Sequence, residues 1–234
     1  PAYLKLNHRV RKMIQTKVDS SGIPVLTGTI DRIKSSEGQK HYFNSSMFLT
    51  PNHKYVLYNK LHLVPFAEYI PLSGKFPSLM NLNFGQGNFT QGSEYTVFEW
   101  KNVKFSNLIC YESSMPSIVR EFIQQGAEMM TIQTNDGWLG NSAGPYQHYD
   151  VARIRAIENR VPIIRSANTG ISGLILANGI SIKEQNLGEV AVFSVAVPMG
   201  NAGSIYSRYG DVFAMICFVI FLLLGPIPCL RKRS

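Results

Sequence analysis

Short apolar runs rich in β-branched and aromatic residues recur along the chain, and two stretches of helical periodicity separate some of them. This pattern predicts a mixed α/β fold. The predicted strands cover residues 24–30, 41–49, 54–58, 95–100, 103–110, 128–134, 162–167, 171–177 and 189–197.

Start and stop signals place the helices. Pro116 in a first turn and Gly126 after the last periodic residue predict a helix over 116–125, with Ser113 or Ser114 as its cap. Further helices are expected over 145–160 and 3–18. The pair Asn178 and Gly179, between two apolar runs, predicts a hairpin turn.

Residues 71–92 have no sustained period and contain four glycines and two prolines, which predicts a long loop. The loop is more apolar than solvent exposure requires. Two interpretations stay open: its apolar side chains fold back onto the core, or they form a lid that faces lipid.

Residues 212–230 carry no formal charge and lie between Asp211 and a basic cluster at 231–233. As a helix they would span about 28 Å, close to the hydrocarbon thickness of a bilayer. We therefore expect a transmembrane helix, although Pro226 and Pro228 also leave a buried core helix open. The basic cluster should stay in the cytoplasm, which puts residues 1–210 on the opposite side. Because nothing earlier in the chain would carry them across, we expect a piece of a longer membrane protein.

Composition narrows the functional classes. An apolar content of 45% with 16% charged residues supports a sizeable core. The net charge of +8 comes from the first 17 residues and from 231–233, so the body has no basic face for nucleic acid. Three cysteines are too few for a disulfide scaffold, and only Cys110 lies in the polar part of the chain.

The segment NLICYES, residues 107–113, is the sharpest chemical signal. An apolar strand ends at Cys110 and leads into a helix, a corner that exposes a thiol and directs backbone N–H groups toward an oxyanion. Such geometry suits a nucleophile, although a solitary cysteine is more commonly a small buried apolar residue. A thiol of ordinary pKa would need a nearby cation and a carboxylate base.

Lys60 is a candidate for that cation because it follows a short strand and precedes an apolar corner. The alternative is a solvated lysine at a strand end. Glu68 and Glu112 lie near these two motifs, and either could instead be an ordinary salt-bridge partner.

Other polar residues carry weaker signals. Trp138 lies between Gly137 and Gly140 in a loop after a strand, where α/β active sites form, but packing is the alternative. His148 is expected to be a structural hydrogen-bonding residue, because no metal-ligand spacing surrounds it. No phosphate-binding glycine loop is present, and we expect neither metal nor cofactor.

Three segments carry a family resemblance: YNKLHLVPFAEYIPL, LICYES and TNDGWLGNSAGPYQHYDVARIRAIENRVPIIRSANTGIS. They closely resemble the nitrilase-type domain of the apolipoprotein N-acyltransferases, within the carbon–nitrogen hydrolase superfamily. The resemblance implies a four-layer α-β-β-α sandwich with two sheets packed face to face. The expected organisation is a hydrolase-like domain at 1–200, a linker at 201–211, the transmembrane helix at 212–230 and a cytoplasmic basic tail at 231–234.

The resemblance also implies roles for individual residues. Cys110 corresponds to the nucleophile, Lys60 to the lysine of a Glu-Lys-Cys triad and Glu68 to a second important glutamate. Tyr111, Glu112 and Trp138 correspond to positions near the substrate. The triad's base lies in a Trp-Pro-Glu motif that the 234 residues do not contain. We therefore expect this part of the chain alone to be poorly active, since a general base contributes roughly 10²- to 10⁴-fold in rate.

The implied activity is transfer of an acyl chain from phospholipid, through a Cys110 thioester, to the N-terminal cysteine amine of an apolipoprotein. The implied location is the bacterial inner membrane, with several spans in the full-length protein and the catalytic domain on the periplasmic side. Two other functions stay open: nitrilase-like hydrolysis of a small amide, and a membrane-tethered scaffold without activity.

Overall fold

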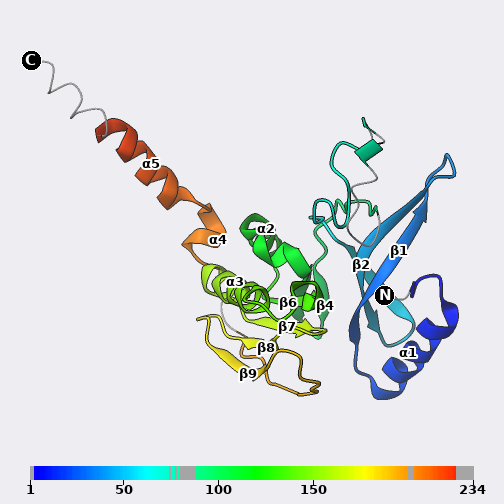
Figure 1. Cartoon of the computed structure of the whole chain (residues 1–234). Coiled ribbons are helices and arrows are strands. Elements are labelled where there is room, and N and C mark those ends of the chain that lie inside the picture. Colours follow the sequence, from blue (N-terminus) through cyan, green and yellow to red (C-terminus); the bar gives the residue numbers. More distant parts are fainter. Residues whose placement is uncertain (1–2, 74, 77, 80–87, 200–202, 225–234) are drawn as a thin grey trace, which may run out of the picture.

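The computed structural model describes residues 3–73, 75–76, 78–79, 88–199 and 203–224, which build two β-sheets flanked by helices (Figure 1). The smaller sheet is antiparallel, in the order β1 (Val25–Lys34), β2 (Lys40–Thr50), β3 (Lys54–Asn59). The larger sheet runs in sequence order through β4 (Phe98–Trp100), β5 (Val103–Ile109), β6 (Met129–Thr134), β7 (Ile163–Ala167), β8 (Ser172–Ile175) and β9 (Ser181–Gln185). Its three central strands β5, β6 and β7 are parallel, so their carboxyl ends share one edge of the sheet.

Alternation along β2 separates the two faces of the smaller sheet. Met47 and Leu49 pack with Leu4 and with Val18 of helix α1 (His8–Ser21), which covers one face. Phe48 points to the other face and lies against Phe98 and Phe105 of the larger sheet, at ring-centroid distances of 5.4 and 5.1 Å.

The larger sheet meets the smaller one through a partly polar seam. The Gln133 amide of β6 donates across it to the carbonyl of Leu26 of β1 at 3.2 Å. Within the larger sheet, the Thr131 hydroxyl donates to the Asn107 side chain at 2.7 Å. Helices α2 (Pro116–Gln124) and α3 (Gly144–Asn159) cover the opposite face, and their buried side chains join the main core. The order is therefore helix, sheet, sheet, helix, as the family resemblance implied (Figure 1).

The predicted helices form, with shifted ends. The N-terminal helix is α1, which begins at His8 after the Asn7 cap and ends at the left-handed Gly22. Helices α2 and α3 match the predicted ranges within one residue. The predicted serine cap of α2 is wrong: Met115 precedes the helix with no side-chain cap, because the Ser113 hydroxyl donates to the carbonyl of Cys110 instead.

One predicted strand is wrong. Residues 189–197 are an apolar run rich in β-branched residues, but the structure forms no strand there, and the side chains of Val190 and Val192 are fully exposed. The edge strand is β9, whose sequence is too polar to predict a strand. The hairpin at Asn178 and Gly179 is confirmed, since it joins β8 to β9 in antiparallel pairing.

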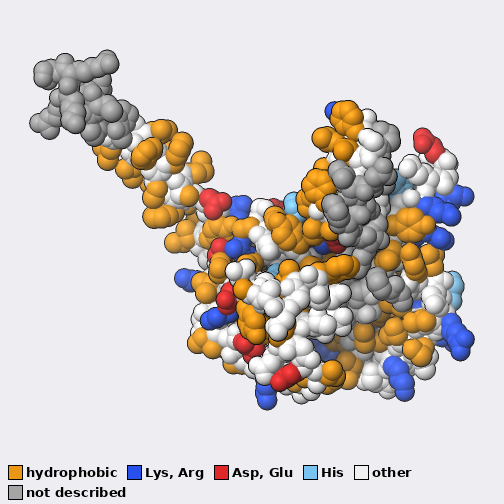
Figure 2. All heavy atoms as spheres, in the orientation of Figure 1, with side chains coloured by type: hydrophobic (Ala, Val, Ile, Leu, Met, Phe, Trp, Pro, Cys, Tyr) orange, Lys and Arg blue, Asp and Glu red, His pale blue; other side chains and the backbone are white. Residues whose placement is uncertain are grey.

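The described chain ends in two helices, α4 (Ile205–Tyr209) and α5 (Val212–Leu224). The Arg120 and Gln124 side chains of α2 donate to the carbonyls of Ser207 and Arg208 and hold α4 to the domain. From there α5 projects away, and its apolar side chains are exposed (Figures 1 and 2).

At 13 residues, α5 covers only the first part of the predicted span, and residues 225–230 lie outside the described residues. None of the helices that the described residues form has the length and apolar character needed to cross a membrane.

The predicted loop at 71–92 is only partly described, with residues 74, 77 and 80–87 outside the described ranges. The side chains of Leu72 and Phe76 are more than half exposed. These two residues therefore do not fold back onto the core. The returning segment is fixed by Phe89 N–H, which donates to the carbonyl of Glu68 at 2.8 Å.

Candidate active site

Cys110 lies at a sharp corner between two elements. Strand β5 ends at Ile109, and Cys110 begins the short 3₁₀ helix η2 (Cys110–Ser114) with φ of +54°. A non-glycine residue in this left-handed region costs roughly 1–2 kcal/mol, and such strain is concentrated at functional sites. The Cys110 carbonyl accepts a hydrogen bond from the Ser113 hydroxyl at 3.0 Å, which closes the corner.

A cavity of about 540 Å³ opens beside this corner, at the carboxyl ends of the parallel strands. Cys110 lines it, half-buried and not in a disulfide. The other lining residues are Val64, Ala67, Glu68, Tyr111, Ser114, Asn135, Asp136, Trp138, Leu139, Gly144, Gln147, His148 and Val151. Most of the lining surface is apolar, so the cavity suits a ligand with a substantial apolar part.

Lys60 is buried, with 1% of its surface exposed, so the solvated interpretation is wrong. Its Nζ donates to Glu68 Oε2 at 2.7 Å and to Oε1 at 2.9 Å. Glu68 also accepts from the Asn44 side-chain amide and from Val64 N–H, both at 2.8 Å. The lysine is thus fixed through the carboxylate that lines the cavity with Cys110.

Glu112 is fully buried and is absent from the cavity lining, so its position does not fit direct contact with a substrate. Its carboxylate accepts from the Tyr58 hydroxyl and Leu61 N–H at 2.7 Å and from His62 N–H at 3.1 Å. The other oxygen accepts from Ile109 N–H at 2.7 Å. Glu112 therefore ties the Cys110 corner to the segment that follows Lys60.

Burial shifts the pKa values of Glu112 and Tyr58. It raises the pKa of Glu112, and the hydrogen bonds from Ile109 and Tyr58 oppose that shift. Burial and the adjacent negative charge of Glu112 also raise the pKa of Tyr58, so the Tyr58 hydroxyl stays a protonated donor.

Replacing Glu112 with glutamine should lower the free energy of unfolding by about 2 kcal/mol, because the amide group leaves at least one buried N–H unpaired. Tyr58→Phe, which removes one of the four donors, should cost only about 1 kcal/mol. Urea unfolding of both variants checks this. Wild-type stability in Glu112→Gln would contradict the positioning role.

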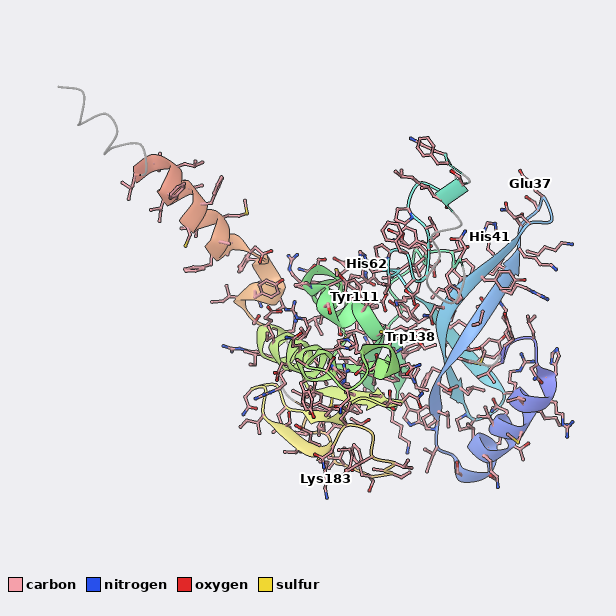
Figure 3. All side chains as sticks on the ribbon, in the orientation of Figure 1. Glu37, His41, His62, Tyr111, Trp138 and Lys183 are labelled. Carbon is pink, nitrogen blue, oxygen red and sulfur yellow. The ribbon has the colours of Figure 1, made fainter. Side chains whose placement is uncertain are left out.

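Tyr111 and Trp138 line the cavity near its surface and lie on the side of the domain that carries His62 (Figure 3). The Tyr111 ring lies 6.0 Å from the His62 ring. Trp138 is 67% exposed, so core packing does not explain it. Both aromatic side chains are available to a ligand.

Sequence reasoning missed Asp136 and Arg165, which meet His148 behind Cys110. Arg165 Nη2 donates to Asp136 Oδ2 at 2.5 Å, and Asp136 Oδ1 lies 2.9 Å from His148 Nδ1. The prediction that His148 is a hydrogen-bonding residue is confirmed. The one available signal for Arg165 was a charged residue inside an apolar strand, since such a residue needs a buried partner.

The neighbouring His148 and Arg165 shift the pKa of Asp136. Burial opposes ionisation of Asp136, but the His148 hydrogen bond and the charge of Arg165 outweigh it and lower the pKa of Asp136. Asp136 is therefore ionised at neutral pH. Among the described residues, no three His, Cys, Asp or Glu side chains gather as a metal site requires.

Gly170 leaves the space that Asp136 occupies. A Cβ atom at residue 170 would lie 2.8 Å from Asp136 Cγ. Gly170→Ala should therefore lower the free energy of unfolding by about 1–3 kcal/mol through overpacking. Gly28→Ala, where a Cβ meets nothing within 4 Å, serves as the control in thermal unfolding. Equal stability of the two variants would contradict the packing argument.

Comparisons with known proteins show the family of the chain. The carbon–nitrogen hydrolase family profile matches residues 7–205. Apolipoprotein N-acyltransferase of Geobacter metallireducens is 37% identical over 82% of this chain and 37% of its own length. The protein of the same name from Chlorobaculum tepidum is 33% identical over 100% of this chain and 48% of its own length.

The chain thus spans less than half the length of both relatives. Among solved structures, Nit3 of Saccharomyces cerevisiae, a member of the nitrilase superfamily, has a TM-score of 0.58 and 18% identity. That match covers 76% of this chain and 61% of Nit3, and it shows the shared fold. Because the family profile covers most of the sequence and the fold agrees, the chain belongs to the carbon–nitrogen hydrolase family.

Proposed function

We propose that the full-length protein is an apolipoprotein N-acyltransferase in which Cys110 carries the acyl chain. The observation that carries the proposal is the Cys110 corner itself, strained and lining a mostly apolar cavity beside the Glu68 carboxylate. The names of the Geobacter and Chlorobaculum relatives supply the reaction.

In the first step the Cys110 thiolate attacks the ester carbonyl of a phospholipid. The tetrahedral intermediate breaks its C–O bond, and a lysophospholipid leaves with a proton on its new hydroxyl. The acyl chain remains as a thioester on Sγ. By the resemblance, the proton from the thiol passes to the glutamate of a Trp-Pro-Glu motif.

In the second step the α-amine of the apolipoprotein's lipidated cysteine attacks the thioester. The C–S bond breaks, an amide forms, and the thiol is restored after the amine loses a proton. We assign the backbone N–H of Tyr111 to stabilisation of the oxyanion in both steps, and Lys60 to the same role by the family resemblance. Lys60 does not itself line the cavity, so its charge would act from behind Glu68. An apolar cavity limits loss of the thioester to water.

The membrane location belongs to the same proposal. Residues 212–230 would cross the inner membrane, with α5 as the first part of that span and the catalytic domain on the periplasmic side. The support is α5 itself, whose 13 residues are all apolar and whose described side chains are all exposed. The exposed Leu72 and Phe76 would face lipid near the cavity.

The test uses full-length protein in vesicles of phospholipid with isotope-labelled acyl chains, given a diacylglyceryl lipopeptide with a free N-terminal amine. We expect the label to move to the lipopeptide as an amide. A lipopeptide with an acetylated N-terminus is the control and should stay unlabelled. Turnover of small aliphatic amides without labelled lipopeptide would replace this proposal with the amidase function, and no turnover of either substrate would favour the scaffold.

A further inference from the structure

Arg165, Asp136 and His148 come from three different elements and meet beneath the Cys110 corner. Arg165 lies on β7, Asp136 on the short helix η3 (Asp136–Leu139) after β6, and His148 on α3. Arg165 and Asp136 are both at most 2% exposed. A buried ion pair of this kind is costly to assemble and often neutral for stability, so its place next to the nucleophile needs an explanation.

The group touches the corner through His148. Its Nε2 lies 2.9 Å from the Ser113 hydroxyl and 3.3 Å from the carbonyl oxygen of Cys110. The Ser113 hydroxyl donates to the same carbonyl. The Ser113 hydroxyl and the His148 ring thus both lie against the Cys110 carbonyl and pack around this left-handed corner.

Arg165 reaches the thiol electrostatically. Burial lowers the pKa of Arg165, and the negative charges of Asp136 and of an ionised Cys110 oppose that shift. The geometry places this cation one side chain away from the corner, because Arg165 Nη2 lies 3.2 Å from His148 Nδ1 and His148 Nε2 lies 3.3 Å from the Cys110 carbonyl oxygen. A buried positive charge this near stabilises negative charge that develops on the sulfur. Its Nη1 is buried and has no hydrogen-bond partner among the described residues. This part of the guanidinium is therefore not committed to another group.

We propose that Arg165, Asp136 and His148 are positioning residues that hold the Cys110 corner and provide a second cation, besides Lys60, for its thiolate. The inference deepens the proposed function, and its meaning for acyl transfer rests on that function. Its own content concerns only the reactivity of Cys110, which can be measured without phospholipid or lipopeptide.

The experiment measures the rate of Cys110 alkylation by iodoacetamide at neutral pH in the full-length protein, with the modified peptide identified by mass spectrometry. The variant is Asp136→Asn with Arg165→Met, which removes both charges and leaves neither unpaired. The control is Asp150→Asn with Arg153→Met, which removes an exposed ion pair from α3.

We expect the buried double variant to react about tenfold more slowly, because the corner is held less firmly and a nearby buried cation is lost, and the control to react at the wild-type rate. Arg165→Lys, which keeps the charge, should recover most of the rate, and the ultraviolet absorbance of the thiolate should follow the same order. A folded buried variant that reacts at the wild-type rate would overturn the inference.

If the double variant does not fold, the alkylation rate of His148→Leu is the test instead, because this variant leaves the Asp136–Arg165 pair in place. It should slow alkylation, and His148→Gln, which keeps a donor, should restore part of the rate; a wild-type rate in His148→Leu overturns the proposal.

The experiments distinguish failure of the proposed function from failure of this inference. Absence of acyl transfer in the wild type with charge-dependent alkylation rejects only the function, and the reverse result rejects only this inference.

Discussion

Cys110→Ser should lower acyl transfer by about 10⁴-fold or more, the scale of losing a nucleophile. Serine keeps nearly the same shape, so the corner, its left-handed φ and the Ser113 hydrogen bond to the carbonyl should persist. The loss is chemical, because an alcohol is far less ionised than a thiol at neutral pH and a carboxylate is too weak a base to deprotonate it. Initial rates of lipopeptide acylation measure the effect.

The matched control is Cys217→Ser, which changes an exposed free cysteine on α5. It should retain wild-type activity, since Cys217 lies on the projecting helix and not on the cavity. Thermal unfolding of both variants should resemble the wild type. Residual transfer above a few per cent in folded Cys110→Ser would contradict the assignment of the nucleophile.

Lys60→Met should lower activity by about 10²- to 10³-fold, the typical effect of removing one group that stabilises an oxyanion. It should also lower the free energy of unfolding by about 3–5 kcal/mol, because Glu68 is left mostly buried without its cation. Urea unfolding and transfer rates separate these two effects.

The double variant Lys60→Met with Glu68→Gln separates the structural role of Lys60 from its catalytic role. Replacing both partners removes the unpaired charge, so much of the stability should return while the activity stays low. If activity returned together with stability, Lys60 would be a structural residue and its catalytic role would be wrong.

The sequence predicted the framework well where a strand is a short apolar run. The apolar runs at 54–58 and 103–110 correspond to β3 and β5 within one residue, and these strands deliver Lys60 and Cys110 to the site. The residues that follow each of these two strands carry the chemistry.

The wrong strand and the missed ion pair both depend on how strands pair, which the order of apolar and polar residues along the chain does not reveal. Residues 189–197 have the composition of a strand, but a strand also needs a neighbour to pair with, and the polar β9 occupies the edge of the sheet. The Asp136–Arg165 pair joins residues 29 positions apart and depends on β6 and β7 lying side by side. Neither the register nor the layer order is visible in the periodicity of one strand.

The burial of Lys60 and Glu112 illustrates the same limit. For Lys60 a solvated lysine, and for Glu112 an ordinary salt-bridge partner, stayed open as alternatives, because local composition does not reveal partners. Glu68 and the backbone amides of Leu61, His62 and Ile109 make burial possible. These partners converge only after the two sheets have packed together.

The most direct test is peptide mapping of the full-length protein after exposure to phospholipid in the absence of lipopeptide. We predict an added acyl mass on the peptide that contains Cys110, which hydroxylamine removes as expected of a thioester. Acyl transfer that proceeds with no such adduct, or with the acyl chain on another residue, would contradict the role of Cys110 as the acyl carrier.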